Sequence, residues 1–314
     1  MKALVTGGSG FIGSHVVDRL IAKGIGVRVF DMVLPRYGQN IEFYKGSLLD
    51  LESVRLALNG VDVVFHLAAI ADVNDVVKDP FYAEAINVRG TANLLEAIRR
   101  SSGIRRLVYG STTWVYSAAK ETNVDEDTAL VAPDHFYTAT KITSEYYCHS
   151  YGKLFNIPTT ILRYGIPYGP RAREAAVIPV FVKKAFNKEP LTIAGDGMQF
   201  RKFVYVEDLA EGNVLALQAA GKNRVYNLDG QEKVTIKQIA ETIQKVVGDV
   251  KIEYTPARAG DFGGKEVNSD RAAAELGWKP KVAFEEGVRR YVAWLKEDMD
   301  RRKKEWDRVD PALR

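Results

Sequence analysis

The sequence has few of the residues that build disulfides, metal sites or membrane spans. Its 314 residues include one cysteine, Cys148, and four histidines. A single cysteine cannot form an intrachain disulfide, and the histidines show no metal-ligand spacing. No apolar run reaches the about 20 residues that cross a membrane, and Met1-Lys2 leads directly into a strand-like run rather than a signal peptide. We therefore expect a cytoplasmic protein with no metal and no membrane partner.

The sequence also lacks an excess of charge of either sign, because its 44 basic and 40 acidic residues leave a net charge of only +4. The basic residues form no stripe with interleaved aromatics, which argues against nucleic acid as a ligand. The one dense charged run, residues 296–308, is typical of a solvated terminal helix. The 46% hydrophobic content is enough to bury a full core in one large or two modest domains.

The first half of the chain alternates short apolar runs with helical patterns, which is typical of βαβ units and a parallel sheet. Strands are expected at 3–6, 27–31, 41–45, 61–67, 107–111 and 159–164, and helices at 11–23, 51–58, 81–100 and 137–155. The apolar runs lack strict alternation, as expected for strands that are covered on both faces.

After Pro170, proline and glycine separate shorter elements. Helices are expected at 177–187, 206–220, 236–247 and from 285, and strands at 191–193, 225–228 and 251–254. The fold prediction is therefore α/β, with a Rossmann-type doubly wound parallel sheet and a smaller C-terminal α/β substrate-binding lobe. We assign residues 1–168 to the domain that contains this sheet, with 203–228 returning to it, and residues 169–314 to the lobe.

A glycine turn joins the first strand to the first helix. Gly7, Gly10 and Gly13 have the spacing G-x-x-G-x-x-G, and backbone N–H groups in such a turn can approach a pyrophosphate at a helix N-terminus. Asp31 ends the second strand, about 20 residues further on, where a ribose-binding acid is expected. Its carboxylate would accept hydrogen bonds from a 2′-hydroxyl and repel a 2′-phosphate. We predict NAD rather than NADP; a purely structural turn with a surface aspartate is the alternative.

A tyrosine and a lysine lie four residues apart at Tyr137 and Lys141. On a helix they share one face, so the ammonium can reach the phenol and favour the phenolate form of a group whose pKa is ordinarily about 10. Tyr116 and Lys120 have the same spacing, but they enter a polar stretch without helical periodicity, whereas Tyr137 opens a helical pattern. We predict that Tyr137 and Lys141 form an acid/base couple beside a dinucleotide, and that Tyr116 is packing or pocket wall.

Further short motifs follow in order along nearly the whole chain. They are His66-Leu-Ala-Ala69, Asn87-Val-Arg-Gly-Thr91, Ser111-Thr-Thr-Trp-Val-Tyr116, Leu162-Arg-Tyr164, the run from Gly195 to Asp208, Pro256-Ala-Arg-Ala-Gly-Asp261 and Leu276-Gly-Trp-Lys-Pro280. With the glycine turn and the Tyr137–Lys141 pair, they resemble the extended short-chain dehydrogenase/reductases, specifically the NAD-dependent epimerase/dehydratase family typified by UDP-glucose 4-epimerases. The resemblance implies bound NAD, a nucleotide-sugar substrate and a homodimer paired through helices 81–100 and 137–155.

The resemblance also assigns roles to individual residues. Thr112 would hydrogen-bond the reacting sugar oxygen, with Ser111 and Thr113 as alternatives, while Tyr137 would be the base and Lys141 would hold the nicotinamide ribose. The cofactor would contact Gly7, Gly10, Phe11, Ile12, Gly13, Asp31, Ser47, Leu48, Leu67, Ala68, Ala69, Asn87, Tyr137, Lys141 and Tyr164, although an aspartate is more usual at Ser47. The substrate would contact Thr112, Tyr137, Val177, Arg201, Arg258 and Asp261, the two arginines at its diphosphate and Asp261 at its nucleotide ribose. Two guanidiniums also suit an anionic substrate on charge alone.

The sequence departs from the family pattern at a few places. Ile166 stands where an asparagine amide commonly contacts phosphate, and a frequent asparagine is missing near Ala176. Thr113 and Trp114 replace the Asp-Glu pair of 4,6-dehydratases, and the sugar-acid decarboxylases' glutamate is also missing. Elimination of water then has no obvious proton donor, which favours simple removal and return of hydride.

We therefore predict an NAD-dependent UDP-sugar 4-epimerase. Tyr137 would take the proton of a sugar hydroxyl while NAD takes hydride from the same carbon, and the transient 4-keto-sugar would turn and receive hydride on its other face. A nucleotide-sugar reductase or dehydratase and a non-catalytic NAD-binding regulator are the alternatives.

Overall fold

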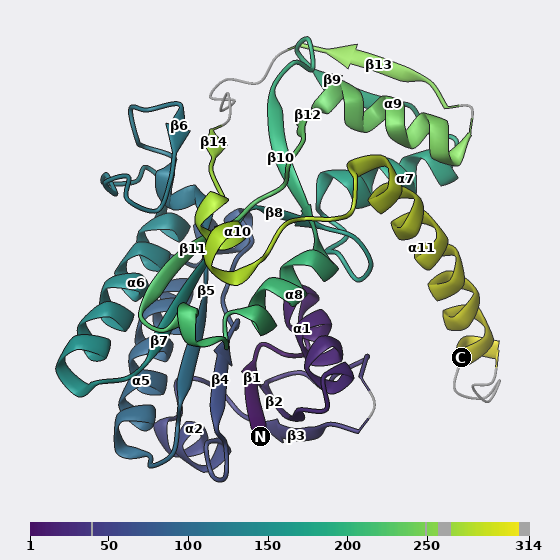
Figure 1. Ribbon diagram of the computed structural model, residues 1–314. Coiled ribbons are helices and arrows are strands. Elements are labelled where there is room, and N and C mark those ends of the chain that lie inside the picture. Colours follow the sequence, from purple (N-terminus) through teal and green to yellow (C-terminus); the bar gives the residue numbers. More distant parts are fainter. Residues whose placement is uncertain (39, 249, 257–264, 308–314) are drawn as a thin grey trace. The chain divides into compact units, whose positions relative to one another are not determined.

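The computed structural model of the protein describes residues 1–38, 40–248, 250–256 and 265–307 (Figure 1). These residues form two compact units. The first comprises Met1–Ile166, Val206–Gly230 and Lys265–Pro280, and the second takes the remaining described residues. No helix in the described ranges is long and apolar enough to cross a membrane.

A seven-stranded parallel sheet forms the centre of the first unit. Its order is β11-β7-β5-β4-β1-β2-β3, built from β1 (Lys2–Thr6), β2 (Gly26–Asp31), β3 (Glu42–Lys45), β4 (Val63–His66), β5 (Arg106–Thr112), β7 (Thr159–Tyr164) and β11 (Arg224–Leu228). Every residue of β5 and β7 is buried, which explains why the apolar runs do not alternate. The chain order reverses between β1 and β4, and ligands of open α/β sheets bind at such a switch point.

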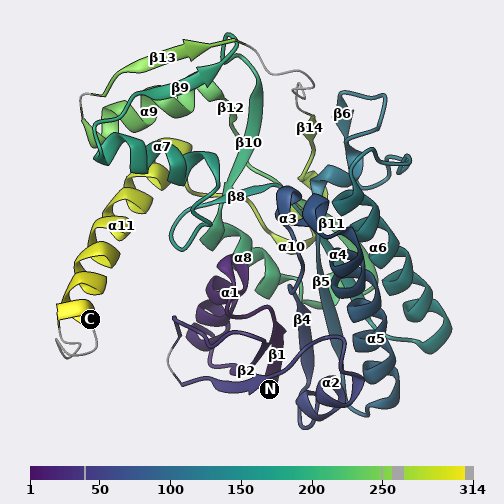
Figure 2. The same ribbon diagram turned by 180° about the vertical axis from the view of Figure 1, so that it is seen from behind.

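Helices cover both faces of this sheet (Figures 1 and 2). Helices α1 (Phe11–Ala22) and α8 (Val206–Leu215) pack together on one face, and α2 (Leu51–Ala57), α5 (Gly90–Arg100) and α6 (Phe136–Phe155) cover the other. On the second face, Leu94 and Cys148 from the helices pack in one core with Leu107 from the sheet. The predicted doubly wound α/β fold is confirmed, and Cys148, the one cysteine, is buried in this core.

The helix expected at 81–100 is not one regular helix. It is preceded by α3 (Val73–Lys78) and consists of α4 (Pro80–Glu84), a π-helical turn at Ala85–Arg89, and α5. The carboxylate of Asp79 accepts the N–H of Tyr82, and Pro80 occupies the first helical position, which suits a residue without an N–H. The π turn places Asn87 in a widened segment, a feature that is common at functional sites.

The second unit has smaller sheets and three helices. Strands β8 (Ile166–Tyr168), β10 (Phe200–Tyr205) and β12 (Lys233–Thr235) form one sheet, and β9 (Leu191–Ala194) pairs with β13 (Ile252–Thr255). The helices are α7 (Val177–Phe186), α9 (Ile236–Val247) and α11 (Phe284–Asp307). A capping box between Thr235 and Gln238 starts α9, because each side chain accepts the other residue's backbone N–H.

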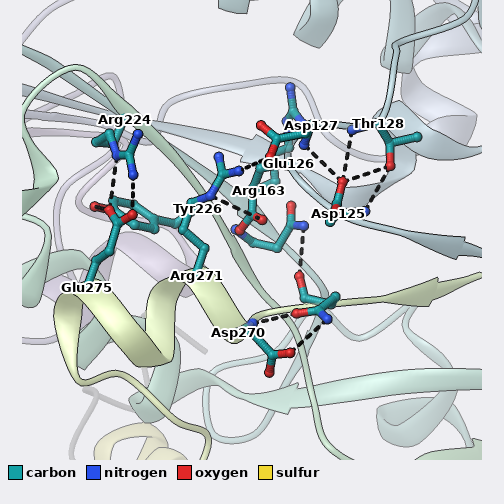
Figure 3. Close-up of polar contacts among 12 residues, drawn as sticks. Asp125, Glu126, Asp127, Thr128, Arg163, Arg224, Tyr226, Asp270, Arg271 and Glu275 are labelled. Carbon is teal, nitrogen blue, oxygen red and sulfur yellow. Dashed lines mark hydrogen bonds and ion pairs between the residues drawn. The ribbon is translucent and has the colours of Figure 1, made fainter.

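Residues 265–280 belong to the first unit, although the sequence analysis placed them in the substrate-binding lobe. Strand β14 (Glu266–Val267) pairs with β6 (Asn123–Val124), and α10 (Asp270–Leu276) packs on β11. Figure 3 shows the ion pairs that accompany this packing, from Arg271 to Asp127 and from Arg224 to Glu275. The indole N–H of Trp278 also donates to the carbonyl of Asp208 at 2.8 Å. These are long-range contacts that no local pattern in the sequence reveals.

Trp278 is the anchor of this segment, since its side chain is only 2% exposed. We expect Trp278→Ala to lower the free energy of unfolding by about 3–5 kcal/mol through the cavity it leaves. Trp278→Phe should cost about 1 kcal/mol, because the hydrogen bond from the indole N–H to the Asp208 carbonyl is lost. Urea unfolding measures both, with the exposed neighbour substitution Lys279→Ala as a control expected to change stability by less than about 0.5 kcal/mol. Equal effects of Trp278→Ala and Lys279→Ala would contradict this packing.

Candidate active site

Several of the residues singled out in the sequence lie at the carboxyl ends of neighbouring parallel strands. Thr6 of β1 is paired in register with His66 of β4, and Thr112 of β5 with Tyr164 of β7. Asp31 ends β2, the neighbour of β1 on the other side. Residues far apart in the chain are thus gathered at the edge of the sheet where open α/β folds bind ligands.

The glycine turn is shaped by close contacts between backbones. A Cβ on Gly13 would lie 2.1 Å from the Gly7 oxygen, and one on Gly7, whose φ is +71°, would lie 2.6 Å from the nitrogen of Ala68. A Cβ on Gly10 would meet only the Gly7 oxygen, at 3.2 Å. Gly10 is also the N-cap of α1, and no side chain caps this helix. The exposed N–H groups at this helix start fit a pyrophosphate.

Asp31 holds the glycine turn against the end of β2. Its Oδ2 accepts the N–H of Ser9 at 3.1 Å, and its Oδ1 accepts the N–H of Val33 at 3.2 Å. The Ser9 hydroxyl donates to the Val33 carbonyl at 2.6 Å, so the glycine turn is also bonded directly to the segment after β2. A carboxylate has about four acceptor positions, so these two bonds leave others for ribose hydroxyls.

The loop after β4, residues 67–70, carries Leu67, Ala68 and Ala69, all half-buried. Asn87 from the π turn holds this loop, because its Oδ1 accepts the N–H of Ile70 at 2.8 Å and its Nδ2 donates to the Ile70 carbonyl at 3.0 Å. The same Nδ2 also donates to Thr140 at 3.0 Å. The side chain of Asn87 is therefore committed to shaping the loop, and its contact with a cofactor stays a prediction.

Tyr164 is part of the buried wall at this edge. A Cβ on Gly110 would lie 2.8 Å from its ring, and its hydroxyl donates to Asn213 at 2.7 Å. Burial raises the pKa of Tyr164 well above its ordinary value, so this phenol stays protonated. Its contact with a cofactor stays a prediction.

The other predicted binding residues are distributed over both units. Leu48 lies in the core with its carbonyl accepting from Asn93 at 2.9 Å, and Ser47 accepts the N–H of Leu49 at 3.2 Å. Val177 starts α7 and Arg201 lies on β10, both in the second unit. Arg258 and Asp261 lie outside the described residues, so their roles, and those of the residues above, stay predictions.

Lys141 is buried on α6, with 4% of its surface exposed. Its ammonium lies 4.4 Å from the centre of the Tyr109 ring, and burial lowers its pKa to about 8 against the opposing effect of Glu145. Within the described ranges, no acceptor forms a hydrogen bond or ion pair with this ammonium. A buried cation without hydrogen bonds is costly, so the hydroxyls of a bound ribose fit this position.

Tyr137 lies one helical turn before Lys141, near the start of α6. This helix packs against β5 and against the short 3₁₀ turn Thr113–Tyr116 that follows Thr112. The Thr112 hydroxyl oxygen accepts the N–H of Trp114 at 3.2 Å, which leaves its hydrogen to donate to another oxygen. The proposed base, cation and hydroxyl therefore come from elements that pack together.

A buried ion pair that the sequence analysis missed supports α6. Glu145 lies one turn after Lys141 and accepts hydrogen bonds from Arg163 of β7, from Nη2 at 2.7 Å and from Nε, which is shared between the two carboxylate oxygens at 3.1 and 3.3 Å. The Ser111 hydroxyl donates to the same carboxylate. Arg163 also donates to the hydroxyl of Tyr116 at 2.6 Å. Burial raises the pKa of Tyr116 to about 12, so Tyr116 cannot serve as the base. The sequence could have indicated Glu145 through its position four residues after Lys141. It could not indicate the partner, because Arg163 lies on a strand distant in the sequence.

Lys141 should reduce stability while no ligand is bound. Its pKa of about 8 in the folded protein lies below the unfolded value of 10.5, so the unfolded state binds more protons between these pH values. Compared with Lys141→Met, the parent should therefore gain stability as pH rises through that window. At pH 7 the free energy of unfolding of Lys141→Met should exceed that of the parent by roughly 3 kcal/mol, and the difference should shrink towards pH 10.5.

Unfolding of the cofactor-free proteins in urea, at several pH values, measures this effect. Lys153→Met is the control, because Lys153 is exposed on the same helix and should change stability by less than about 0.5 kcal/mol. A Lys141→Met protein less stable than the parent at pH 7 would contradict the cost assigned to this ammonium.

Comparisons with known proteins identify the family to which this chain belongs. Residues 3–229 match the NAD dependent epimerase/dehydratase family. The chain is 35% identical over 303 residues to a putative UDP-glucose 4-epimerase of Methanocaldococcus jannaschii, across 93% of this chain and 98% of that protein. Its structure resembles UDP-glucose 4-epimerase from Thermotoga maritima, solved with UDP-glucose, with a TM-score of 0.89 and 33% identity over 95% of this chain and all (100%) of the other.

A second solved relative was crystallised with the cofactor. UDP-glucuronic acid 4-epimerase from Bacillus cereus, in complex with UDP-glucuronic acid and NAD, gives a TM-score of 0.86 and 30% identity over 95% of this chain and 99% of the other. The family prediction made from the motifs is confirmed, and with it NAD as the cofactor of the family. The chain belongs to the NAD-dependent epimerase/dehydratase family.

Proposed function

We propose that the protein is an NAD-dependent UDP-sugar 4-epimerase. The observation that carries this proposal is the buried Lys141 ammonium, which lacks an acceptor among the described residues and lies one turn from Tyr137. NAD supplies a hydride acceptor and, in the return step, a hydride donor. The glycine turn fits its pyrophosphate, Asp31 a ribose without a 2′-phosphate, and Lys141 the hydroxyls of the second ribose.

Tyr137 acts as the acid/base group on the sugar. As phenolate it takes the proton of the C4 hydroxyl, and it returns a proton after the configuration at C4 is inverted. Moving a phenol pKa from about 10 to near neutrality needs roughly 4 kcal/mol, for which the adjacent Lys141 charge in a poorly solvated site is the main source. Thr112 is proposed to donate a hydrogen bond to the same sugar oxygen, since the bond that it accepts from Trp114 leaves its hydroxyl hydrogen available.

The residues after Thr112 favour epimerisation over elimination. Thr113 and Trp114 carry no carboxyl group, and the Trp114 ring packs edge-on against His135 with 5.5 Å between ring centres. A dehydratase needs a proton donor for the departing hydroxyl, and neither residue supplies one. Inversion at C4 needs no acid/base group besides Tyr137, so it is the reaction that these side chains support.

The relatives' substrates suggest the substrate class. Their names specify UDP-glucose and UDP-glucuronic acid, and we propose interconversion of UDP-glucose and UDP-galactose as the first reaction to test. Arg201 and Arg258 are proposed to bind the diphosphate, Asp261 the nucleotide ribose and Val177 the substrate by packing. A cytoplasmic location stays a prediction.

Tyr137→Phe tests the function. Because the variant keeps the ring and loses the proton-accepting oxygen, we expect kcat to fall by about 10²–10⁴ while NAD remains bound. NMR of the products formed from UDP-glucose, UDP-glucuronic acid and UDP-N-acetylglucosamine measures the reaction and identifies the sugar. Tyr146→Phe, an exposed tyrosine on the same helix, is the control and should keep parental turnover.

Two outcomes would reject the epimerase proposal. Parental turnover of the Tyr137→Phe protein would remove Tyr137 from the chemistry. Consumption of one NADH per product formed would identify a reductase, because an epimerase regenerates its cofactor in each cycle.

We also propose a homodimer formed through the helices that the family resemblance names. Phe81 of α4 is 87% exposed and Leu154 of α6 is 73% exposed, and these two helices contact each other. Large apolar side chains exposed to this degree suit an interface. We expect the parent to be dimeric in light scattering and the Phe81→Glu/Leu154→Glu protein to be monomeric. Met299→Glu, at an exposed apolar residue of α11, should leave the dimer intact. A monomeric parent would reject the proposal.

A further inference from the structure

A chain of buried hydrogen bonds connects the loop after β4 to the π turn. Thr6 Oγ1 accepts the N–H of Ala68 at 3.3 Å and lies 2.8 Å from His66 Nδ1. His66 Nε2 lies 2.9 Å from Thr91 Oγ1, which donates to the carbonyl of Asn87 at 2.5 Å. His66 is 1% exposed and Thr91 is equally buried, so water does not compete for these bonds.

The donor and the acceptor of each hydrogen bond in this series can be assigned in only one way. Thr91 has a single hydroxyl hydrogen, and that hydrogen is used on the carbonyl of Asn87. Thr91 must therefore accept from His66, which places a proton on Nε2. In a neutral ring Nδ1 is then an acceptor, so it takes the hydroxyl hydrogen of Thr6, whose oxygen is left to accept from Ala68.

The surroundings of His66 keep this ring neutral. Its ring centre lies 5.6 Å from that of Tyr109, over whose ring the Lys141 ammonium also lies. Burial and the Lys141 charge lower the pKa of His66 to about 3. A charged imidazole would donate from both nitrogens and would leave Thr6 and its hydroxyl hydrogen without an acceptor.

Both ends of this series of hydrogen bonds hold the loop at residues 67–70. At one end the N–H of Ala68 is held directly, and at the other the carbonyl of Asn87 is held by the hydroxyl of Thr91. The Ser144 hydroxyl lies between the carbonyls of Asn87 and Thr140, at 2.8 and 2.9 Å, and its one hydrogen is shared between them. Asn87 in turn bonds both backbone groups of Ile70. The orientation of His66 thereby fixes the course of residues 67–70.

We propose that His66 is a positioning residue for NAD, which acts as its neutral Nε2–H tautomer to fix the loop at residues 67–70 between β1 and the π turn. The proposal rests on the proposed function only in assigning this loop to the cofactor site. His66 itself touches no ligand in this account; its hydrogen bonds set the affinity for NAD through the backbone that they hold.

The tautomer can be measured without substrate or cofactor. In long-range ¹H–¹⁵N correlation spectra of histidine-labelled protein, His66 should show a protonated Nε2 and an unprotonated Nδ1, unchanged from pH 8 to about 5. A His66→Gln protein, which lacks this signal, assigns it among the four histidines. A protonated Nδ1, or a ring that titrates near the ordinary histidine pKa of about 6.5, would overturn the proposal.

Thr91 provides a matched pair of variants for the coupling to NAD. Thr91→Val removes the acceptor of His66 and should weaken NAD binding about tenfold in calorimetry, which corresponds to one lost hydrogen bond, while the tautomers become mixed. Thr91→Ser keeps the hydroxyl and should restore both the affinity and the tautomer. Parental NAD affinity in Thr91→Val with an altered tautomer would reject the positioning role. Both readouts are independent of any sugar, so failure of the epimerase assignment would leave them unchanged.

Discussion

The site depends on one buried charge, the ammonium of Lys141. The protein buries most of the Lys141 side chain and places the ammonium over the ring of Tyr109, yet in the described part of the chain gives it no acceptor. Such a group reduces the stability of the protein alone and gains partners only when a ligand brings them. We infer that the cofactor completes its hydrogen bonds, and that the charge then maintains Tyr137 as phenolate. The cost in stability and the catalytic function thus have the same physical origin.

The surrounding structure keeps this helix and the cofactor loops in place. Glu145 and Arg163 form a buried pair one turn after Lys141, and removing one partner of such a pair is usually costly. On the other side of the site, Asp31 holds the glycine turn and Asn87 holds the loop after β4. Each support is a side chain whose polar atoms bind backbone or an opposite charge, so the ligand-facing groups are positioned before any ligand arrives.

Local patterns in the sequence were sufficient to predict the fold and to propose the centre of the candidate site. Glycine spacing, an aspartate at a strand end and a tyrosine–lysine pair on one helix face each report geometry within a few residues or one βαβ unit. Strand β7 and helix α9 were predicted at their observed bounds for the same reason. The helix expected at 206–220 ends instead at Leu215, and a 3₁₀ turn follows at Ala219–Gly221.

What the sequence did not reveal depends on contacts between distant segments. Glu145 of α6 forms its ion pair with Arg163 of β7. Residues 265–280 join the first unit through contacts with β6 and β11. The π turn at Asn87 arises where hydroxyls from Thr91 and Ser144 take its carbonyl, which helical periodicity does not encode. Such features require coordinates, because their partners lie far away in the chain.

The ionisation of Tyr137 tests the central claim most directly. The ultraviolet difference between the parent and the Tyr137→Phe protein, titrated with NAD bound, isolates this phenol from the other tyrosines. The account predicts a phenolate that forms with a pKa of roughly 7 and disappears when Lys141 is replaced by methionine. A phenol that stays protonated until about pH 10 in the NAD complex would contradict it.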